Sequence, residues 1–309
     1  MNNKVICILG PTASGKTKLV FELARHLPIE IVSVDSALIY RDMNIGTAKP
    51  TKEELARVPH HLIDICDPAE NYSVGQFCAD VIKIIDDILQ RKKIPVLVGG
   101  TMMYYYLLQK GFSQFPDSDF SIRDTVTQKA AELGWDKLHE ELEKIDPTAA
   151  AQIHKHDTQR ISRALELYYA TGQTRTELQQ DQTWQQHPYE FVNIILMPPN
   201  RQILHERIEN RVDEMLKAGL IAEVKALHER GDLSLDLPSI RSVGYRQVWQ
   251  YLDGDLDEKD LRFKIIVATR QLAKRQFTWL KRFEGQQFDS ASTDLTSDVL
   301  TYLHHCRPD

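Results

Sequence analysis

The sequence predicts an α/β fold in which a parallel sheet, flanked by helices, carries an all-helical insertion domain. Short apolar, β-branched runs have the composition of buried parallel strands, and they lie at 4–9, 29–34, 94–98 and 191–196. Helical patterns separate these runs, as expected when parallel strands are joined by crossovers. From about 115 to 186 the chain is instead polar, helical and poor in strand signals. We therefore expect a core of 1–114 and 187–309, with 115–186 as the insertion.

Composition and charge narrow the class of protein. The 309 residues are 42% hydrophobic and 27% charged, the composition of a soluble globular protein. No run has the length of a membrane span, and the short N-terminal apolar run is not a signal peptide. The four cysteines show no C-x-x-C spacing, so we expect free thiols in a reducing cytoplasm. A net charge of −6 excludes a uniformly basic protein but allows a local basic stripe for nucleic acid.

The first strand leads into a phosphate-binding motif. Residues 10–17 read Gly-Pro-Thr-Ala-Ser-Gly-Lys-Thr, which has the G-x-x-x-x-G-K-[ST] spacing of a P-loop, and a helical pattern follows. Glycines let the backbone wrap an anion, and the helix N-terminus faces it. This context favours a P-loop NTPase-like core that binds a di- or triphosphate over a chance glycine-rich turn. Lys16 adds a point charge, and Thr17 can place its hydroxyl on Mg²⁺.

Two further strands end in polar residues. The run at 29–34 leads directly to Asp35, and the carboxyl ends of parallel strands border the ligand crevice of α/β proteins. Asp35 is therefore a candidate general base or outer Mg²⁺ ligand, with a turn or N-cap role as the alternative. The run at 94–98 ends in Gly-Gly-Thr, where many P-loop NTPases carry an Asp for Mg²⁺. This departure weakens an ATPase interpretation and leaves Thr101 as a hydroxyl at the site.

Other polar clusters have more than one interpretation. Lys49, in the loop at 45–50, is plausible beside phosphate or substrate. The nearby group His60, His61, Asp64 and Asp67 matches no metal template, so packing and turn roles are favoured. Tyrosines at 104–106 fit a core better than a base-stacking platform, and 76–90 should be a covering amphipathic helix.

In the insertion, candidate helices lie at 122–133, 135–144, 148–153, 158–171 and 174–180. Arg160 and Arg163 share a helix face, with Gln159 beside them. They could bind a polyanion, or they could form a solvated face paired to Glu166.

After the insertion, the segment 206–227 is predicted to be helical and is rich in charge. Its Arg207 and Arg211 lie one turn apart and could face a diphosphate. Pairing in solvent with Glu206, Glu209 or Asp213 is the alternative. A turn and a helix start follow at 238–246.

The segment 261–283 is basic and contains no acidic residue, although the whole chain is acidic. Apolar residues recur at helical spacing and predict a buried stripe of Leu261, Ile265, Ala268, Leu272 and Trp279. The cations fall largely off that stripe, with Phe277 and Trp279 among them. Contact with a phosphate backbone is the natural interpretation, and a merely solvated basic face is the alternative.

Several motifs in a fixed order resemble the bacterial tRNA dimethylallyltransferases, a family of tRNA isopentenyltransferases. Besides the P-loop they are the segments 33–40, 44–50, 98–101, 157–166, 237–246 and 269–279, so the resemblance spans nearly the whole chain. It implies transfer of a dimethylallyl group from dimethylallyl diphosphate to N6 of the adenosine immediately 3′ of the anticodon. The expected partners are this diphosphate, the tRNA anticodon stem-loop and the cofactor Mg²⁺ on Thr17, with no membrane contact. We expect a monomer, although no pattern in the sequence bears on assembly.

The resemblance also implies roles for residues. Asp35 would be the general base, Thr101 would bond near the same nitrogen, and Lys16 would stabilise the leaving group. The diphosphate would be bound by Gly10, Pro11, Thr12, Ala13, Ser14, Gly15, Lys16 and Thr17, and by Arg211. The tRNA would be bound by Asp35, Ser36, Ala37, Leu38, Thr101, Arg123, Gln159, Arg160, Ile161, Ser162, Arg163, Ile240, Arg241, Ser242, Val243, Gly244, Tyr245, Lys274, Arg275, Gln276, Phe277, Thr278, Trp279, Leu280 and Lys281. Relatives often have Arg where Lys281 stands, which keeps the charge but loses bidentate geometry.

Three alternatives stay open from the sequence. A P-loop small-molecule kinase would use Asp35 on an acceptor hydroxyl, but it gives the basic segment no purpose. An isopentenyltransferase acting on free AMP or ATP would not need the large insertion. A non-catalytic RNA-binding or nucleotide-switch protein would not need Asp35 and Thr101 at strand ends beside the P-loop.

Overall fold

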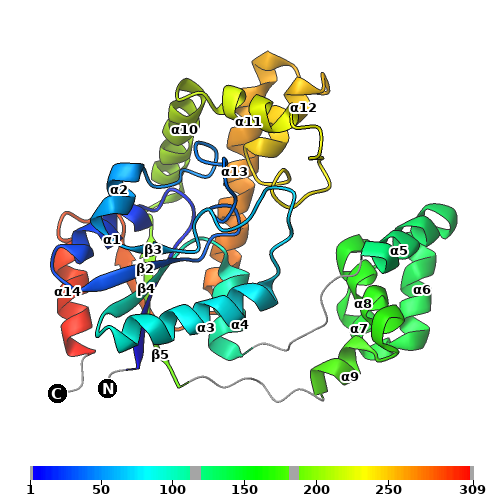
Figure 1. Ribbon diagram of the computed structural model, residues 1–309, viewed down its shortest axis with the longest axis horizontal. Helices are drawn as coiled ribbons and strands as arrows, with labels where there is room; N and C mark the ends of the chain where they lie inside the picture. Colours follow the sequence, from blue (N-terminus) through cyan, green and yellow to red (C-terminus); the bar gives the residue numbers. More distant parts are fainter. Residues whose placement is uncertain (1–2, 112–119, 181–187, 307–309) are drawn as a thin grey trace. The chain divides into compact units, whose positions relative to one another are not determined.

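The computed structural model describes residues 3–111, 120–180 and 188–306 (Figure 1). It divides into two compact units: Met1–Lys110 with Pro188–Asp309, and Gly111–His187. The boundaries expected at 114/115 and 186/187 lie outside the described residues.

The first unit is built on a six-stranded sheet with the order β3-β2-β4-β1-β5-β6. Every neighbouring pair is parallel, which confirms the expected α/β class. The strands are β1 (Lys4–Leu9), β2 (Ile29–Ser33), β3 (His60–His61), β4 (Ile94–Val98), β5 (Glu190–Met197) and β6 (Gln286–Asp289). Because β1 lies between β4 and β5, the P-loop leaves the sheet from its centre.

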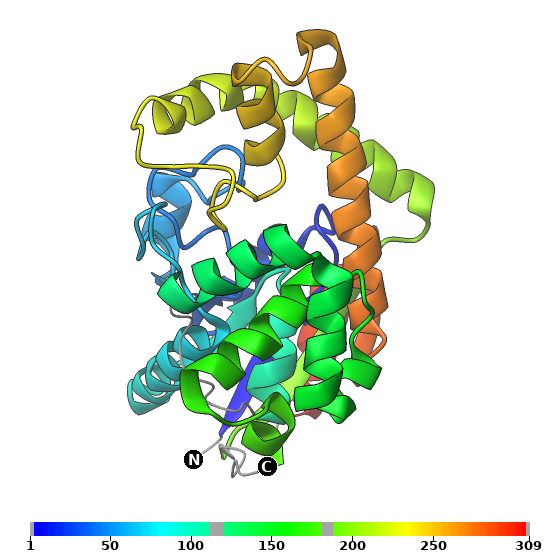
Figure 2. The same ribbon diagram turned by 90° about the vertical axis from the view of Figure 1, so that its right-hand side faces the viewer.

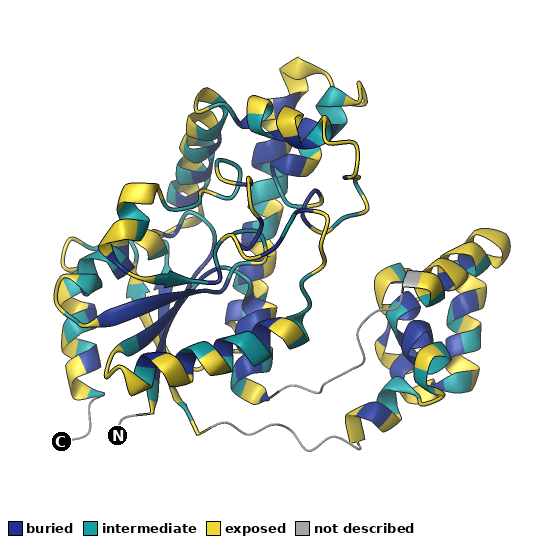
Figure 3. Ribbon diagram, viewed as in Figure 1, coloured by how far each residue is buried: buried dark blue, intermediate teal, exposed yellow. Residues whose placement is uncertain are grey.

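Helices cover both faces of the sheet, so its central strands are buried along most of their length (Figure 3). Ile6 and Ile8 of β1 share an apolar cluster with α1 (Lys16–Ala24) and α14 (Leu295–His305). On the other face, Gln109 of α4 (Met102–Lys110) bonds to Asn193 of β5 at 2.8 Å. Helix α3 (Val74–Gln90) packs beside α4, and α2 (Lys52–Arg57) lies in the loop region before β3.

A second cluster lies beyond the carboxyl ends of the strands. It is formed by residues 39–43 and by α10 (Arg201–Lys217), α11 (Leu220–His228), α12 (Tyr245–Leu252) and α13 (Glu258–Leu280). The helical character expected at 206–227 is confirmed, and the segment is divided between two helices, α10 and α11. Gly219 stands between them with φ of 102°, a left-handed conformation that favours glycine and ends the helix.

Helix α13 packs along α10 (Figure 1, Figure 2). Leu261 and Ile265 of the expected stripe are buried, whereas Ala268, Leu272 and Trp279 are only partly covered. The buried face is completed by Ile266, Ala273, Gln276 and Leu280. The buried face therefore does not follow the expected stripe along the whole helix. It includes the polar residue Gln276, which an apolar pattern would not select.

The second unit is a helical bundle, described here by itself. Its helices are α5 (Phe120–Leu133), α6 (Trp135–Ile145), α7 (Pro147–Gln152), α8 (Thr158–Thr171) and α9 (Arg175–Gln180). The expected helices are thus confirmed, with ends shifted by at most 2 residues. Its core contains Val126, Leu138, Leu142, Ile161 and Leu165.

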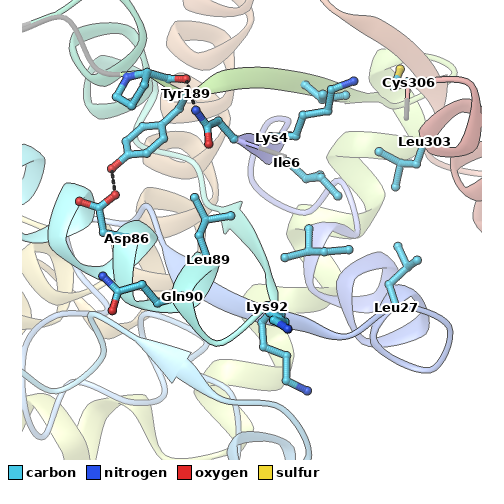
Figure 4. Close-up of a pocket in the computed structure, with 15 residues that line it drawn as sticks. Lys4, Ile6, Leu27, Asp86, Leu89, Gln90, Lys92, Tyr189, Leu303 and Cys306 are labelled. Carbon is cyan, nitrogen blue, oxygen red and sulfur yellow. Dashed lines mark hydrogen bonds between the residues drawn. The ribbon is translucent and has the colours of Figure 1, made fainter. Parts of the chain in front are cut away.

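A cavity of about 500 Å³ opens at the amino ends of β1, β4 and β5 (Figure 4). Its wall includes apolar Ile6, Leu27 and Leu303, and Tyr189 donates to Asp86 at its rim at 2.7 Å. The P-loop leaves the opposite edge of the sheet, so this cavity is separate from it. Among the described residues, no helix is long and apolar enough to cross a membrane.

Candidate active site

The P-loop connects β1 to α1 and wraps closely on itself. Ala13 and Gly15 have positive φ values of 60° and 86°, and consecutive turns of this kind direct backbone N–H groups inward. A Cβ on Gly10 would lie 2.6 Å from Ser14 Oγ and 2.8 Å from the Leu196 carbonyl oxygen. Only glycine fits there, which explains the first fixed position of the motif. The loop is shaped as an anion cradle.

Ser14 adds an unused hydroxyl to this cradle. Its Oγ is buried, and it makes no hydrogen bond in the described part of the chain. A buried polar atom without a partner is costly, so such atoms mark places where a ligand completes the bonding. A phosphate oxygen is an acceptor that fits a donor hydroxyl inside a P-loop.

Lys16 points back into the loop. Its Nζ donates to the carbonyl oxygens of Gly10 at 2.9 Å and Pro11 at 2.7 Å. Burial and the positive charge of Arg211 together lower the pKa of Lys16 to about 7, against the opposing effect of Asp35. A bound polyanion would favour the ammonium form, so Lys16 is matched to a negatively charged ligand.

Asp35 and Thr101 meet at the carboxyl ends of β2 and β4, which are neighbours in the sheet. Thr101 Oγ1 accepts the Ser36 N–H at 3.0 Å, and its backbone N–H donates to Val34 at 3.1 Å. One oxygen of Asp35 accepts the Ala37 N–H at 2.9 Å, so the expected turn role is also present. The other carboxylate oxygen can accept from a substrate, and the Thr101 hydroxyl donates to Ser36 Oγ at 3.4 Å, a long contact that a substrate acceptor could replace.

The glycines before Thr101 make this approach possible. A Cβ on Gly99 would lie 1.9 Å from the Val34 carbonyl oxygen, which forbids any larger residue. The end of β4 therefore lies directly against the end of β2. In place of an acidic side chain, β4 supplies close backbone packing beside Asp35.

Arg211 of α10 completes the charged group. It is largely desolvated, which lowers its pKa, while the negative charge of Asp35 raises it. Its Nη2 donates to the Thr47 carbonyl oxygen at 3.4 Å. Glu209 and Asp213 pair instead with Arg270 and Arg262 of α13, so they do not pair with Arg211. The structure thus brings Arg211 to Lys16 and Asp35. Arg207 bonds to Ser290 Oγ at 2.9 Å.

Glu223 of α11 organises the loop at 44–46, a role that sequence reasoning missed. Its carboxylate accepts backbone N–H groups of Asn44, Ile45 and Gly46 at 2.8–3.2 Å. The Tyr245 hydroxyl donates to the same carboxylate at 2.6 Å. Tyr245 therefore helps to hold this loop. Within 240–245, Ile240, Gly244 and Tyr245 are buried, Ser242 and Val243 are partly exposed, and Arg241 is exposed.

Helix α13 presents the expected cations at its C-terminal end. Lys274, Arg275, Thr278 and Lys281 are exposed, whereas Gln276 and Leu280 are buried. Within the described chain, Lys274, Arg275 and Lys281 form no ion pair, in contrast to Arg262 and Arg270. Phe277 and Trp279 are partly exposed, and Trp279 packs edge-on against Tyr106. The side chains of Gln276 and Leu280 are therefore directed into the protein.

The remaining candidates belong to the second unit. Arg160 is exposed on α8 and pairs with Asp157 at 3.3 Å. Arg163 pairs with Glu166 at 3.6 Å, and Arg123 of α5 lies 4.0 Å from the same buried carboxylate. Gln159 is exposed, whereas Ile161 and Ser162 are buried, the latter bonding to Glu166 at 2.7 Å. Only the arginines and Gln159 offer side chains at the surface.

The histidine cluster is occupied by contacts within the protein. His60 Nδ1 lies 2.7 Å from the Val58 carbonyl oxygen, and His61 Nε2 lies 2.9 Å from Glu30. Asp64 pairs with Lys49, and Asp67 with Arg230. Across the described ranges, no group of three or more His, Cys, Asp or Glu side chains is placed to hold a metal ion.

A phosphate cradle with a carboxylate and a hydroxyl on adjacent strand ends defines a group-transfer site for a phosphate-containing substrate. Two family models match the chain: "IPP transferase" over residues 38–283 and "Isopentenyl transferase" over residues 3–66. The chain belongs to the IPP transferase family.

Individual relatives match over almost their entire length. The tRNA dimethylallyltransferase of Coxiella burnetii strain Dugway is 52% identical over 98% of this chain and 97% of its own. That of Legionella pneumophila strain Corby is likewise 52% identical, with the same coverage. Among solved structures, the tRNA isopentenylpyrophosphate transferase of Bacillus halodurans is 36% identical, with a TM-score of 0.71, covering 98% of this chain and 96% of its own. A eukaryotic dimethylallyltransferase acting on tRNA is 28% identical, with a TM-score of 0.80, covering 99% and 80%.

Proposed function

We propose that this protein transfers a dimethylallyl group from dimethylallyl diphosphate to N6 of the adenosine 3′-adjacent to the anticodon in tRNA, releasing diphosphate. The observation that carries the proposal is the placement of Asp35 and Thr101 at adjacent strand ends beside a P-loop. This arrangement pairs a base for an amine with a cradle for a leaving diphosphate. Because its acceptor is tRNA, the enzyme would act in the cytoplasm, and we propose that it does so as a monomer.

The diphosphate end of the reaction uses the P-loop, Lys16 and Arg211. Negative charge grows on the leaving group as the bond between the allylic carbon and oxygen breaks. Fixed donors and buried cations stabilise that charge, and one such donor typically contributes about 10²–10³-fold in rate. Ser14 Oγ, which is buried without a partner, would donate to a phosphate oxygen.

Mg²⁺ fits this site through Thr17 and the substrate itself. Thr17 is exposed at the start of α1, directly after Lys16, and its hydroxyl is the P-loop ligand for such an ion. Mg²⁺ usually takes only one or two protein ligands and completes its shell with phosphate oxygens and water. When bound, it would neutralise charge on the diphosphate.

The amine end uses Asp35. The adenine N6 lone pair forms a bond to the allylic carbon, and the electron pair of the breaking carbon–oxygen bond leaves with the diphosphate. N6 becomes acidic as it attacks, and the Asp35 carboxylate accepts its proton. Thr101, whose oxygen already accepts the Ser36 N–H, would direct its own proton toward the adenine. The target base must leave the anticodon-loop stack to reach this position.

The RNA contacts would come mainly from exposed cations. Lys274, Arg275 and Lys281 on α13 are the best placed in the first unit, and Arg241 adds a further one. In the second unit Arg123, Arg160 and Arg163 would serve the same purpose. The buried members of the expected set, such as Ile161, Ile240, Tyr245 and Leu280, would act by shaping these elements.

One assay tests the proposal. The protein is incubated with tRNA and either dimethylallyl diphosphate or ATP, and the nucleosides are then analysed by mass spectrometry. We expect adenosine heavier by one dimethylallyl group, only with dimethylallyl diphosphate and only at the position 3′ of the anticodon. Phosphorylation from ATP, or prenylation of free AMP in preference to tRNA, would overturn it.

A further inference from the structure

Gln276 is the one residue of the buried face of α13 with a polar side chain, and only 6% of it is exposed. Its neighbours in sequence, Lys274 and Arg275, are exposed. One turn of the helix therefore carries cations on its outer side and an amide on its inner side. A buried amide needs partners for both of its ends.

Both partners of Gln276 belong to the catalytic loops. Its Oε1 accepts the Thr12 N–H of the P-loop at 2.8 Å, and its Nε2 donates to the Gly100 carbonyl oxygen at 2.9 Å. The side chain thus joins the loop after β1 to the loop after β4. These loops carry the diphosphate cradle and Thr101.

The fit of this contact is tight. A Cβ on Gly100 would lie 2.5 Å from Gln276 Nε2, so the amide uses space that only glycine leaves free. Replacing the amide would remove the bond to the Thr12 N–H, and it would leave the Gly100 carbonyl oxygen with only the Met102 N–H as a donor, at 3.1 Å. Two partly buried backbone groups would then lose a bond that fixes their direction.

Helix α13 is also attached to the other charged element of the site. Arg262 forms a bidentate pair with Asp213 of α10, at 2.6 Å and 2.8 Å, and Arg270 pairs with Glu209. Arg211 lies between these two acids in the sequence of α10, on the side that faces Lys16 and Asp35. A shift of α13 would therefore change its contacts with the P-loop, with Gly100 and with α10.

We propose that Gln276 is a positioning residue that couples RNA binding on α13 to the geometry of the diphosphate site. The inference rests on the proposed function, because it takes Lys274 and Arg275 as RNA contacts. RNA bound to these cations fixes α13, and Gln276 then holds the Thr12 N–H and the Gly100–Thr101 turn in register. Coupling of this kind is reciprocal, so diphosphate must tighten RNA binding by the same factor.

The test measures this linkage with full-length protein, an anticodon stem-loop RNA and inorganic diphosphate. The dissociation constant of diphosphate is determined with and without saturating RNA, for wild type and for Gln276→Met. We expect RNA to tighten diphosphate binding by about 5-fold or more in wild type, within the usual range of coupling between sites. In Gln276→Met the ratio of the two diphosphate dissociation constants, without and with RNA, should fall to within about twofold of one. The affinity of this variant for RNA in the absence of diphosphate should stay close to that of wild type. Gln271→Met, the same change at an exposed position of α13, is the matched control and should keep the ratio.

Steady-state rates and a second variant complete the test. Gln276→Met should lower kcat by about tenfold or more, as loss of fixed donors does, and leave KM for tRNA within threefold. The kcat of Gln276→Glu should rise relative to that of wild type as pH falls, because a protonated carboxyl can accept from the Thr12 N–H and donate to the Gly100 carbonyl oxygen.

Two results would overturn the inference. An unchanged ratio in Gln276→Met would show that α13 and the P-loop are not coupled through this amide, and loss of RNA binding alone would make Gln276 an RNA contact. If wild type does not prenylate tRNA, the proposed function fails first, whereas normal transfer with an unchanged ratio rejects only the role of Gln276.

Discussion

At the scale of single residues, the candidate site brings together Lys16, Arg211 and Asp35, whose charges affect one another. Lys16 and Arg211 are both partly buried, and both cations interact with Asp35. Lys16 donates to two carbonyl oxygens of its own loop. Because its pKa is lowered to about 7, Lys16 should take up a proton when a polyanion binds above that pH.

This gives a pH prediction with a defined sign. Free Lys16 is charged below about pH 7 and neutral above it. Bound diphosphate favours the ammonium form and raises the pKa of Lys16, so binding above that pH takes up a proton. Affinity for dimethylallyl diphosphate should therefore fall as pH rises above 7, by at most about tenfold per unit. Calorimetric titration in two buffers of different ionisation enthalpy measures the proton taken up.

Lys16→Met provides the control for this titration. The variant should bind diphosphate weakly and take up no proton between pH 7.5 and 9, above the phosphate ionisation near pH 6. A variant that still takes up a proton would assign the titration to another group.

Asp35→Asn should slow the chemical step by about 10²–10⁴-fold, the usual contribution of a general base. The amide keeps an oxygen for the Ala37 N–H, so the turn and the binding of both substrates should survive. Single-turnover rates on the preformed complex measure the step, and an unchanged rate would leave Asp35 with only its turn role.

At the scale of elements, α13 shows how one helix serves two purposes. Its N-terminal cations are used in the fold, where Arg262 and Arg270 attach it to α10. Its C-terminal cations Lys274, Arg275 and Lys281 are exposed and remain for a partner. The basic run recognised in the sequence is therefore divided by function along its length.

RNA affinity should reflect this division. Each cation that contacts a phosphate contributes about 0.7–0.9 to the slope of log affinity against log salt. Lys274→Ala or Arg275→Ala should weaken binding of all substrate tRNAs about equally and reduce that slope by one contact. Lys259→Ala, at the other end of α13 and paired with Asp257 at 3.2 Å, should leave the slope unchanged. Titrations of tRNA at several salt concentrations measure this slope. If neither Lys274→Ala nor Arg275→Ala reduces it, α13 is not part of the RNA site.

Local patterns predicted the elements that carry their own signal. The four apolar strands, the P-loop and the helices of the insertion follow from composition and spacing that each segment contains. Strand β6, by contrast, reads Gln-Gln-Phe-Asp and pairs only because it lies beside β5. Strand β3 is 2 residues long. Short polar edge strands depend on a neighbour rather than on their own sequence.

The residues of the candidate site also fall into those with a local sequence signal and those without one. The motif residues Lys16, Asp35 and Thr101 were visible because their types and positions after strands point to chemistry. The contacts of Gln276 with Thr12 and of Glu223 with residues 44–46 join segments more than 170 residues apart. No local pattern encodes such pairings, and a Gln on a basic helix has no feature that marks it as buried.

At the scale of the whole molecule, the two units have separate cores. Among the residues that the structure describes, the apolar cluster of the second unit is formed by residues within 126–169, and the two clusters described for the first unit are formed by residues of that unit. Every contact given above for the P-loop, Asp35 and Thr101 also comes from the first unit. The described contacts of the proposed diphosphate site thus lie within the first unit, and we propose that the second contributes to binding RNA.

Removal of the second unit tests this separation. We expect a chain in which a Gly/Ser linker replaces Gly111–His187 to unfold cooperatively and to bind dimethylallyl diphosphate within a few-fold of wild type. Its RNA affinity should fall steeply, and the salt slope should decrease by about 2–3 if Arg123, Arg160 and Arg163 each contact a phosphate. The triple variant Arg123→Ala, Arg160→Ala, Arg163→Ala in the full chain is the control and should lower the slope equally. A deleted chain that loses diphosphate binding while it remains folded would show that the second unit completes the diphosphate site. An unchanged slope in both proteins would place the RNA contacts entirely on the first unit.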